Sequence, residues 1–548
     1  MYVMKSLNLF CLLSSILFIT SCNQNKWEIV IPAEGTALDN LAASEISKYL
    51  FQTTGTLAQI VSLEDSIPPV GPNTIIINSD DSLEDEEFII KSEVNEGNKR
   101  VNLTGGSPIA CLYAAYELAE QLGVRFYLHG DVVPKDIDIK ILDNLDIHEK
   151  PLFKIRGIQP FHDFPEGPDW WTKEDYKAII AQLPKLKMNF IGFHTYPEGG
   201  VGPEPLVWIG TEDQINEDGT VISAYKAKHM TTSTGTWGYP PKPTSSFSHG
   251  SGQLFAEDSY GSDYMLGLDG WPENDREQVA LFNKSGDFFG EVFEFAHSLG
   301  IKTCVGTETP LTVPRQVEER LKAQGTGHMA QGSGHMAQGT GLRAQGSSVD
   351  LYKGMFSWIK KNYPLDYYWF WTPEDWTWGG NTAEQIERTK NDLLAAQQAI
   401  DELGNPFQLA TCGWVLGPKE DRAMFDGLLP KSWPVSCINR QVGFSLVEEG
   451  FRDVEGRPKW AIPWMEDDPA MILPQLWVGR MRKDAADALV YGCDGLLGIH
   501  WRTMILGPNV AALAGAAWDQ NYEQGENRDA GRLGRRPRRA ASQFPLLG

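Results

Sequence analysis

Acidic side chains set among tryptophans are the residues of this sequence best suited to chemistry. Glu374 and Asp375 follow the apolar run 367–372, and Trp376 and Trp378 lie close behind them. Apolar rings raise the pKa of a nearby carboxyl group, and they also stack on the faces of pyranose rings. Glu374 is therefore a candidate proton donor for glycosidic bond cleavage. The alternative is that one of the two acids caps the following helix.

Three consecutive acids beginning at Glu466 follow a second run, 459–464. Like charges at a strand end are unfavourable unless a cation, a substrate or solvent accommodates them. Glycosidases place two carboxylates around the scissile bond, so Glu466 is a candidate nucleophile or base beside Glu374. The alternative is a solvated loop that starts the next helix. Glu308, after the run 301–307, is a third candidate, as a partner of the pair or as the base of an inverting pair in place of Glu466.

The elements that must position these acids alternate between strands and helices from residue 151 onward. This rhythm predicts an α/β fold, a (β/α)8 TIM barrel over residues 151–520. A doubly wound sheet is the alternative, but no Gly-rich fingerprint follows the first strand. The predicted strands are 153–161, 189–194, 301–307, 367–372, 407–414, 434–439, 459–464 and 495–501. The predicted helices include 173–186, 285–299, 351–362, 382–403, 476–491 and 510–518.

Polar and aromatic residues at the other strand ends are candidate ligands, because a barrel builds its active site at the carboxyl ends of its strands. Together they offer hydrogen-bond donors to a hydroxyl-rich molecule, and Arg440 and Arg502 would suit a uronate or sulfate group. The predicted substrate-binding residues are His162, His194, Glu308, Asp375, Trp378, Trp414, Arg440, His500, Trp501 and Arg502.

Residues 26–150 predict a smaller α/β domain. The runs 26–32 and 73–78 are strand-like, 38–50 has helical spacing, and 100–128 reads as a strand, a Gly-Gly turn, a helix and a strand. This arrangement resembles the N-terminal domain that precedes the barrel in β-hexosaminidases and α-glucuronidases. The resemblance implies that the domain supports the barrel and takes little part in chemistry.

Over residues 26–518 the chain resembles lipoprotein glycoside hydrolases of polysaccharide-degrading Bacteroidetes. The hexosaminidase signature, a His-x-Gly-Gly followed by Asp-Glu at the end of strand four, is absent, since Glu374 and Asp375 stand in the opposite order. The resemblance therefore implies a glycosidase without the substrate-assisted mechanism of hexosaminidases. A similarity to α-glucuronidases would also place the acid at Glu374.

The N-terminus has the features of an export signal. Lys5 precedes an apolar run, 7–19, that is too short to span a bilayer. It ends in Thr20-Ser21-Cys22, which resembles a bacterial lipobox, so residues 1–22 are expected to be a lipoprotein signal peptide with lipidation at Cys22. The expected location is the cell envelope of a Gram-negative bacterium, in the periplasm or on the outer-membrane surface. The alternative is an ordinary signal peptide.

Composition narrows the possible partners. A formal charge of −24 disfavours nucleic acid and anionic membrane surfaces. Seven cysteines in 548 residues do not suggest a disulfide scaffold. The Gly-, Gln- and Ser-rich repeats of 323–348 predict a flexible insertion. The Arg-rich segment 527–548 is an atypical basic tail. It either has a function of its own or reflects a lost reading frame, and we favour the second interpretation.

These observations predict a glycoside hydrolase, exo-acting on a complex polysaccharide or oligosaccharide, with Arg440 and Arg502 hinting at an acidic sugar. No cofactor is expected, no metal is expected at the site, and the membrane is reached through the lipid anchor alone. The oligomeric state stays open. One alternative is a non-catalytic surface glycan-binding protein that uses the same aromatic residues. Another is a polysaccharide lyase with Tyr196 and His194 as its base.

Overall fold

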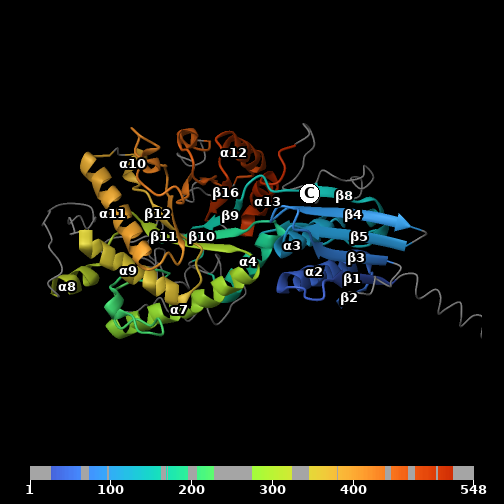
Figure 1. Ribbon diagram of the computed structural model, residues 1–548, viewed down its shortest axis with the longest axis horizontal. Coiled ribbons are helices and arrows are strands. Elements are labelled where there is room, and N and C mark those ends of the chain that lie inside the picture. The colour runs from blue at the N-terminus through green and yellow to red at the C-terminus, as the bar shows by residue number, and fades with distance from the viewer. Residues whose placement is uncertain are drawn as a thin grey trace, which may run out of the picture. The chain divides into compact units, whose positions relative to one another are not determined.

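The computed structural model describes residues 26–62, 73–95, 98–161, 168, 171–195, 206–227, 274–323, 345–378, 381–438, 446–466, 475–501 and 504–521. The chain divides into two compact units, one reaching Pro151 and the other beginning at Leu152 (Figure 1). No helix among the described residues is both long enough and apolar enough to cross a membrane.

The first unit is a mixed sheet of six strands in the order β2-β1-β3-β5-β4-β8. Strands β2, β1, β3 and β5 run parallel, and β4 pairs antiparallel with both β5 and β8. The six strands are β1 (Trp27–Ile31), β2 (Ala58–Ser62), β3 (Asn73–Ser79), β4 (Phe88–Asn95), β5 (Asn98–Gly105) and β8 (Asp146–Glu149). A short hairpin, β6 (Arg125–Tyr127) and β7 (Gly130–Val132), completes the strands.

Two helices pack together against this sheet, α2 (Ala37–Thr54) and α3 (Pro108–Gln121). Helix α2 begins with a reciprocal capping box between Thr36 and Asp39, and it ends at Gly55 in the left-handed conformation. Helix α3 begins with Ser107 as N-cap and proline at its first turn. Most of α3 is buried, which explains why its sequence is apolar on nearly every face.

The second unit is a closed barrel of eight parallel strands. The strands follow one another around the barrel in chain order, and β16 closes on β9. They are β9 (Ile155–Pro160), β10 (Phe190–His194), β11 (Lys302–Glu308), β12 (Tyr367–Trp371), β13 (Gln408–Cys412), β14 (Val435–Ile438), β15 (Lys459–Ile462) and β16 (Gly495–His500).

Helices follow most of these strands and surround the barrel (Figure 1). The α-helices are α4 (Lys173–Lys185), α7 (Asp275–Ser298), α8 (Arg315–Ala323), α9 (Gln345–Asn362), α10 (Asp375–Trp378), α11 (Ala383–Glu402), α12 (Val478–Val490) and α13 (Gly507–Ala516). Short 3-10 turns are η1 (Ile139–Asn144) in the first unit and, in the second, η3 (Glu212–Gln214), η7 (Met424–Asp426), η8 (Glu449–Asp453) and η9 (Met504–Leu506).

The barrel interior is filled by large aromatic side chains that glycines make room for. Trp369 of β12 lies against Phe190 of β10, with ring centroids 5.9 Å apart. A Cβ at Gly306 of β11 would lie 1.9 Å from the Trp369 ring, so a side chain there would displace the indole. The interior is therefore a packed core, and the active site of such a barrel lies at the ends of its strands.

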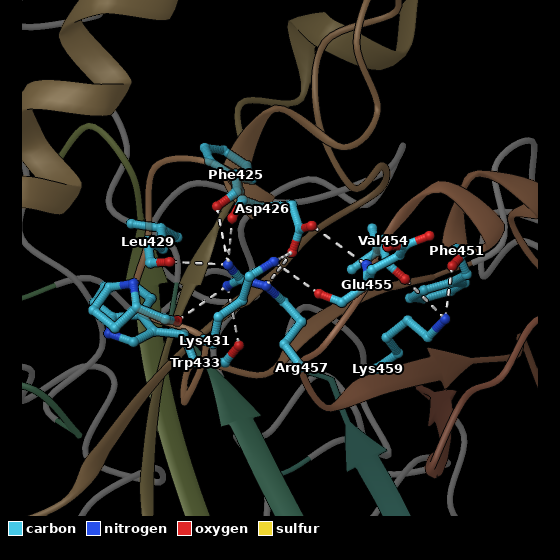
Figure 2. A network of polar contacts seen from close by, with 11 residues as sticks. Phe425, Asp426, Leu429, Lys431, Trp433, Phe451, Val454, Glu455, Arg457 and Lys459 are labelled. Atoms are coloured by element: carbon cyan, nitrogen blue, oxygen red, sulfur yellow. Dashed lines mark hydrogen bonds and ion pairs between the residues drawn. The ribbon is translucent and has the colours of Figure 1, made fainter.

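The connection between β13 and β14 contains no α-helix among its described residues, and Arg457 holds it in place. The Arg457 side chain is fully buried and donates to Asp426 Oδ1 at 2.7 Å. It also donates to backbone carbonyls of this connection, including those of Leu429 at 2.9 Å and Trp433 at 3.3 Å (Figure 2). Asp426 forms a second ion pair with Lys431, in which Oδ1 lies 2.7 Å from Nζ. Thus one guanidinium group satisfies carbonyls that a helix would otherwise pair internally.

The predicted fold class is confirmed, because the structure contains a closed parallel barrel and a separate smaller α/β unit. All eight predicted strands coincide with barrel strands, within three residues at each end. Helix α7 begins at Asp275, ten residues before the predicted start at Ser285, because Asn274 caps it there. Strands β2, β4, β7 and β8 were not predicted. Helix α9 begins at Gln345, inside the span 323–348 predicted to be flexible, while the repeats at 324–344 lie outside the described residues.

Candidate active site

Glu308 lies at the carboxyl end of β11, directly beside β12. Register pairs Glu308 with Trp371, and the Thr309 amide donates to the Trp371 carbonyl at 2.9 Å. Side chains alternate between the two faces of a strand, so Glu308 shares the interior face of Gly306, which packs against Trp369. The Glu308 side chain is half-buried. It is therefore a carboxylate at the end of the barrel where chemistry is expected.

Glu374 lies three residues beyond Trp371, in the turn that follows the neighbouring strand β12, and is also half-buried. Its Oε1 accepts a hydrogen bond of 2.9 Å from the indole Nε1 of Trp414. Trp414 itself is 3% exposed. A hydrogen bond from a buried indole to a carboxylate orients that carboxylate. Glu308 and Glu374 thus come from adjacent strands at the same end of the barrel.

Gly413 is the local reason why Trp414 reaches Glu374. Its φ of 141° lies in the region that favours glycine, and a Cβ there would sit 2.1 Å from Thr372 Oγ1. That Thr372 hydroxyl donates to the Val415 carbonyl at 2.9 Å. The segments that follow β12 and β13 therefore lie close together. Glu374 belongs to the first of these segments and Trp414 to the second.

Six buried rings form a cluster at this end of the barrel, below called the ring cluster. Each lies at, or just beyond, the carboxyl end of its strand, where it packs against a neighbour from another strand. The ring cluster consists of Phe161, His194, Trp371, Trp414, Trp464 and Trp501.

Two rows of contacts make up the cluster. His194 stacks on Trp371 with centroids 4.5 Å apart, and Phe161 contacts Trp371 at 5.6 Å. Trp464 contacts Trp501 at 4.6 Å and Trp414 at 5.3 Å. Phe161 joins the two rows through Trp501, at 5.3 Å. The cluster forms a rigid apolar base beside the carboxylates.

Glu466 differs from the other two acids because its side chain is fully buried. Its Oε1 accepts a hydrogen bond of 2.6 Å from the Trp501 amide. Since its strand β15 lies four positions around the barrel from β11, Glu466 and Glu308 belong to opposite sides. The alternative interpretation of a solvated loop is wrong for Glu466, because its carboxylate is enclosed and bound by the backbone. Asp467 and Asp468 lie outside the described residues.

His500 and Trp501 were both predicted to bind sugar, but His500 is the last residue of β16 and Trp501 follows it directly, so their side chains point to opposite faces. Trp501 belongs to the ring cluster, whereas His500 shares the face of Gly498. A Cβ at Gly498 would meet Met465 and Leu513 of α13, outside the barrel. The structure therefore brings Trp501, and not His500, to the ring cluster.

The remaining predicted residues divide into described and undescribed groups. Asp375 is exposed and accepts from Gln385 at 3.5 Å. The alternative that Glu374 or Asp375 caps the long helix α11 is wrong, because Thr382 is its N-cap. His162, Tyr196, Arg440, Arg502, Cys22 and the side chain of Trp378 lie outside the described residues. Their roles stay predictions.

Sequence reasoning did not single out Phe161, Trp371 or Trp464 as site residues. For Trp464 the signal is two-residue alternation, because it continues the spacing of Trp460 and Ile462 on β15. Within the described part of the chain, no group of three or more His, Cys, Asp or Glu side chains is arranged to hold a metal ion.

Comparison of this chain with known proteins finds similarity to solved structures, but none to family models or curated sequences. No protein-family model matches the chain, and no curated protein matches it. The fold is similar to that of a glycoside hydrolase family 138 enzyme targeting the pectin rhamnogalacturonan II, with 12% identity and a TM-score of 0.55. That alignment covers 91% of this chain and 64% of the other, so the chain spans less than two thirds of that enzyme.

Two further solved structures are also glycoside hydrolases. An exo-β-N-acetylglucosaminidase of family 20 from Vibrio harveyi has 14% identity and a TM-score of 0.47, over 90% of this chain and 70% of the other. A family 115 4-O-methyl-α-glucuronidase with specificity for decorated arabinogalactans has 11% identity and a TM-score of 0.49, over 90% and 56%. The likeness to the family 138 enzyme shows a shared fold, a barrel with additional structure.

Proposed function

We propose that this protein is a glycoside hydrolase that acts from the chain end of a complex polysaccharide or oligosaccharide. The observation that carries the proposal is the pair Glu308 and Glu374, two half-buried carboxylates at, and just beyond, the carboxyl ends of the adjacent strands β11 and β12. One of them is oriented by a buried indole, at 2.9 Å. Two carboxylates beside aromatic rings are the groups that glycosidic bond cleavage requires.

In this proposal Glu374 protonates the leaving oxygen. The Trp414 ring beside it is apolar, and the hydrogen bond from Trp414 fixes the orientation of the carboxylate that would meet the substrate. The protonated form would donate to the glycosidic oxygen while the bond to the anomeric carbon breaks.

Glu308 is the second carboxylate, acting as nucleophile or as base towards water. Glu466 was the first choice from sequence, but its side chain is fully buried and its Oε1 is bound to the Trp501 amide. A nucleophile or base must reach the substrate or a water molecule. Half-buried Glu308 meets that requirement, so burial favours it over Glu466.

The test is hydrolysis of a panel of neutral and uronic-acid-containing oligosaccharides by wild type, Glu374→Gln and Glu308→Gln. Asp401→Asn, at an exposed site on α11, is the matched control. Release of a monosaccharide by wild type and the control, with its loss but retained binding in both glutamine variants, is the expected result. Binding without turnover by wild type would favour a glycan-binding protein. An unsaturated product that absorbs in the ultraviolet would identify a lyase.

We further propose that the chain is anchored in the bacterial cell envelope through lipid at Cys22, on the lipobox-like residues that end its apolar N-terminal run. The test is metabolic labelling with a fatty acid analogue, comparing the full chain with Cys22→Ala. Label in wild type and its absence in the variant would support the anchor. An unlabelled protein released in soluble form would indicate an ordinary signal peptide.

A further inference from the structure

The turn that follows Glu308 is held by one side chain from outside the barrel, Asp392 of α11. Oδ2 of Asp392 accepts from the Thr309 hydroxyl at 2.8 Å and from the Leu311 amide at 3.0 Å. The same oxygen accepts from the Tyr352 hydroxyl of α9 at 2.7 Å. All of these residues are buried, with Asp392 9% exposed. Solvent therefore competes little for the three hydrogen bonds.

The other side of this turn is tied to β12. The Thr309 amide donates to the Trp371 carbonyl, and Glu374 follows Trp371 by three residues. Helix α11, which carries Asp392, begins at Ala383, nine residues after Glu374 and beyond the short helix α10. Asp392 thus connects the backbone directly after Glu308 to the second helix after Glu374. Both carboxylates are held in one hydrogen-bonded frame.

We propose that Asp392 is a positioning residue, which fixes Glu308 relative to Glu374 by holding the turn 309–311; this inference rests on the proposed function. A carboxylate is suited to the role because it only accepts hydrogen bonds, and those it accepts are stronger than those of an amide. Glycosidases depend on the separation of their two carboxyl groups. Misplacement by about 1 Å lowers a rate by about 100-fold.

The kinetic test compares Asp392→Asn with Tyr352→Phe. The second variant removes the hydrogen bond from Tyr352 to Asp392 and leaves the two hydrogen bonds from the turn 309–311 in place. Asp392→Asn is expected to lower kcat by about 10- to 100-fold while KM changes by less than about twofold. The acidic limb of the pH profile, which reports the base, should also change shape. Tyr352→Phe should lower kcat far less, and Asp401→Asn on the same helix should leave it unchanged. Equal losses in Asp392→Asn and Tyr352→Phe would overturn the proposal.

Amide hydrogen exchange separates this inference from the proposed function. In wild type the Leu311 amide is expected to be protected, and in Asp392→Asn it should exchange at least about tenfold faster, the factor that loss of one hydrogen bond gives. Thr309→Val removes one hydrogen-bond donor of the turn and leaves the buried carboxylate of Asp392 unchanged. It replaces Asp392→Asn in this experiment if that variant does not fold. If wild type hydrolyses no glycan, the proposed function fails while the exchange rates still decide the inference. Unchanged exchange at Leu311 in both variants would overturn it.

Discussion

The indole Nε1 of Trp414 donates a hydrogen bond of 2.9 Å to Oε1 of Glu374, across 40 positions of sequence. Pairing of Trp371 with Cys412 in the β12–β13 register sets the two segments side by side. The bond orients the residue proposed as the acid, and the Trp464 ring packs against the Trp414 indole with centroids 5.3 Å apart. The position of the acid is therefore set by a side chain from a neighbouring strand.

Trp414→Phe keeps an aromatic ring and removes this one donor. A hydrogen bond to a charged group contributes about 1.5–3 kcal/mol, so kcat/KM is expected to fall by about 10- to 100-fold. The free energy of unfolding should change by less than the free energy that corresponds to this fall in kcat/KM. Steady-state hydrolysis and denaturant unfolding of the same preparations measure both. Undiminished kcat/KM would show that the indole does not orient Glu374 during turnover.

The three carboxylates should separate by function. Glu374→Gln and Glu308→Gln are expected to lower kcat by about 10²–10⁴-fold, the usual contribution of acid–base groups, with stability near that of wild type. Glu466→Gln is expected mainly to destabilise the fold, by about 1–3 kcal/mol, because a buried acceptor of the Trp501 amide is altered. Turnover per folded molecule and thermal unfolding measure the two effects. Loss of turnover confined to Glu466→Gln would return the catalytic role to Glu466.

Arg457→Met should destabilise the barrel strongly. The variant removes one of the two cations that pair with Asp426 and leaves several carbonyls without a donor, and each buried acceptor left unsatisfied costs about 1–3 kcal/mol. Burial alone would raise the pKa of Asp426, but hydrogen bonds from Lys431 and Arg457 hold it below its usual value. Urea unfolding measures the loss. Arg452→Met, at an exposed position, is the matched control and is expected to change stability by less than about 0.5 kcal/mol.

Asp366 should make stability depend on acid pH. It accepts from His297 Nε2 and from the Thr303 amide, both at 2.8 Å. Burial alone would raise the pKa of Asp366, but these hydrogen bonds lower it below its usual value. Its stabilisation is therefore complete above about pH 3.9, the unfolded value, and is lost as pH falls through the lower folded value.

Asp366→Asn supplies the measurement for this titration. The difference in free energy of unfolding between wild type and variant should be constant at higher pH and shrink below about pH 4. Denaturant unfolding at a series of pH values gives the curve. A difference that stays the same through the acid range would show that Asp366 does not titrate with unfolding.

The described cysteines should resist modification in the folded protein. Burial raises the pKa of the Cys412 and Cys493 thiols to about 12, and that of Cys111 to about 11. The thiolate is the reactive form, so labelling should be very slow until the chain unfolds. Mass spectrometry of labelled peptides, with and without denaturant, measures this. The buried thiols to be followed are Cys111, Cys304, Cys412, Cys437 and Cys493.

The barrel strands were predictable because parallel strands buried on both faces read as continuous apolar runs between turns. Residues 190–194 and 495–500 are examples in which every side chain is buried. Strand β4 was missed because its apolar start, Phe88 to Ile90, gives way to the exposed, mainly polar residues that follow. The true start of α7 was missed because the polar stretch around Asn283 interrupts its apolar spacing.

The candidate site was predictable only in part, because it depends on contacts between distant segments. Strand ends identified Glu308 and Glu374 as carboxylates at one end of a barrel. The carboxylate of Glu466 is bound by the amide of Trp501, which lies 35 positions away, directly after β16. The role of Asp392 depends on a turn 81 to 83 positions before it, and no local pattern marks a helix residue for such a contact.

The row of indoles in the ring cluster also gives the protein an intrinsic optical signal. Trp414, Trp464 and Trp501 have successive ring centroids 5.3 and 4.6 Å apart. Neighbouring transition dipoles at such separations couple, so their near-ultraviolet circular dichroism depends on their mutual angles. One end of the row is bonded to Glu374 and the other, through its backbone amide, to Glu466. A change at either carboxylate would therefore be recorded as a spectral change, without any added label.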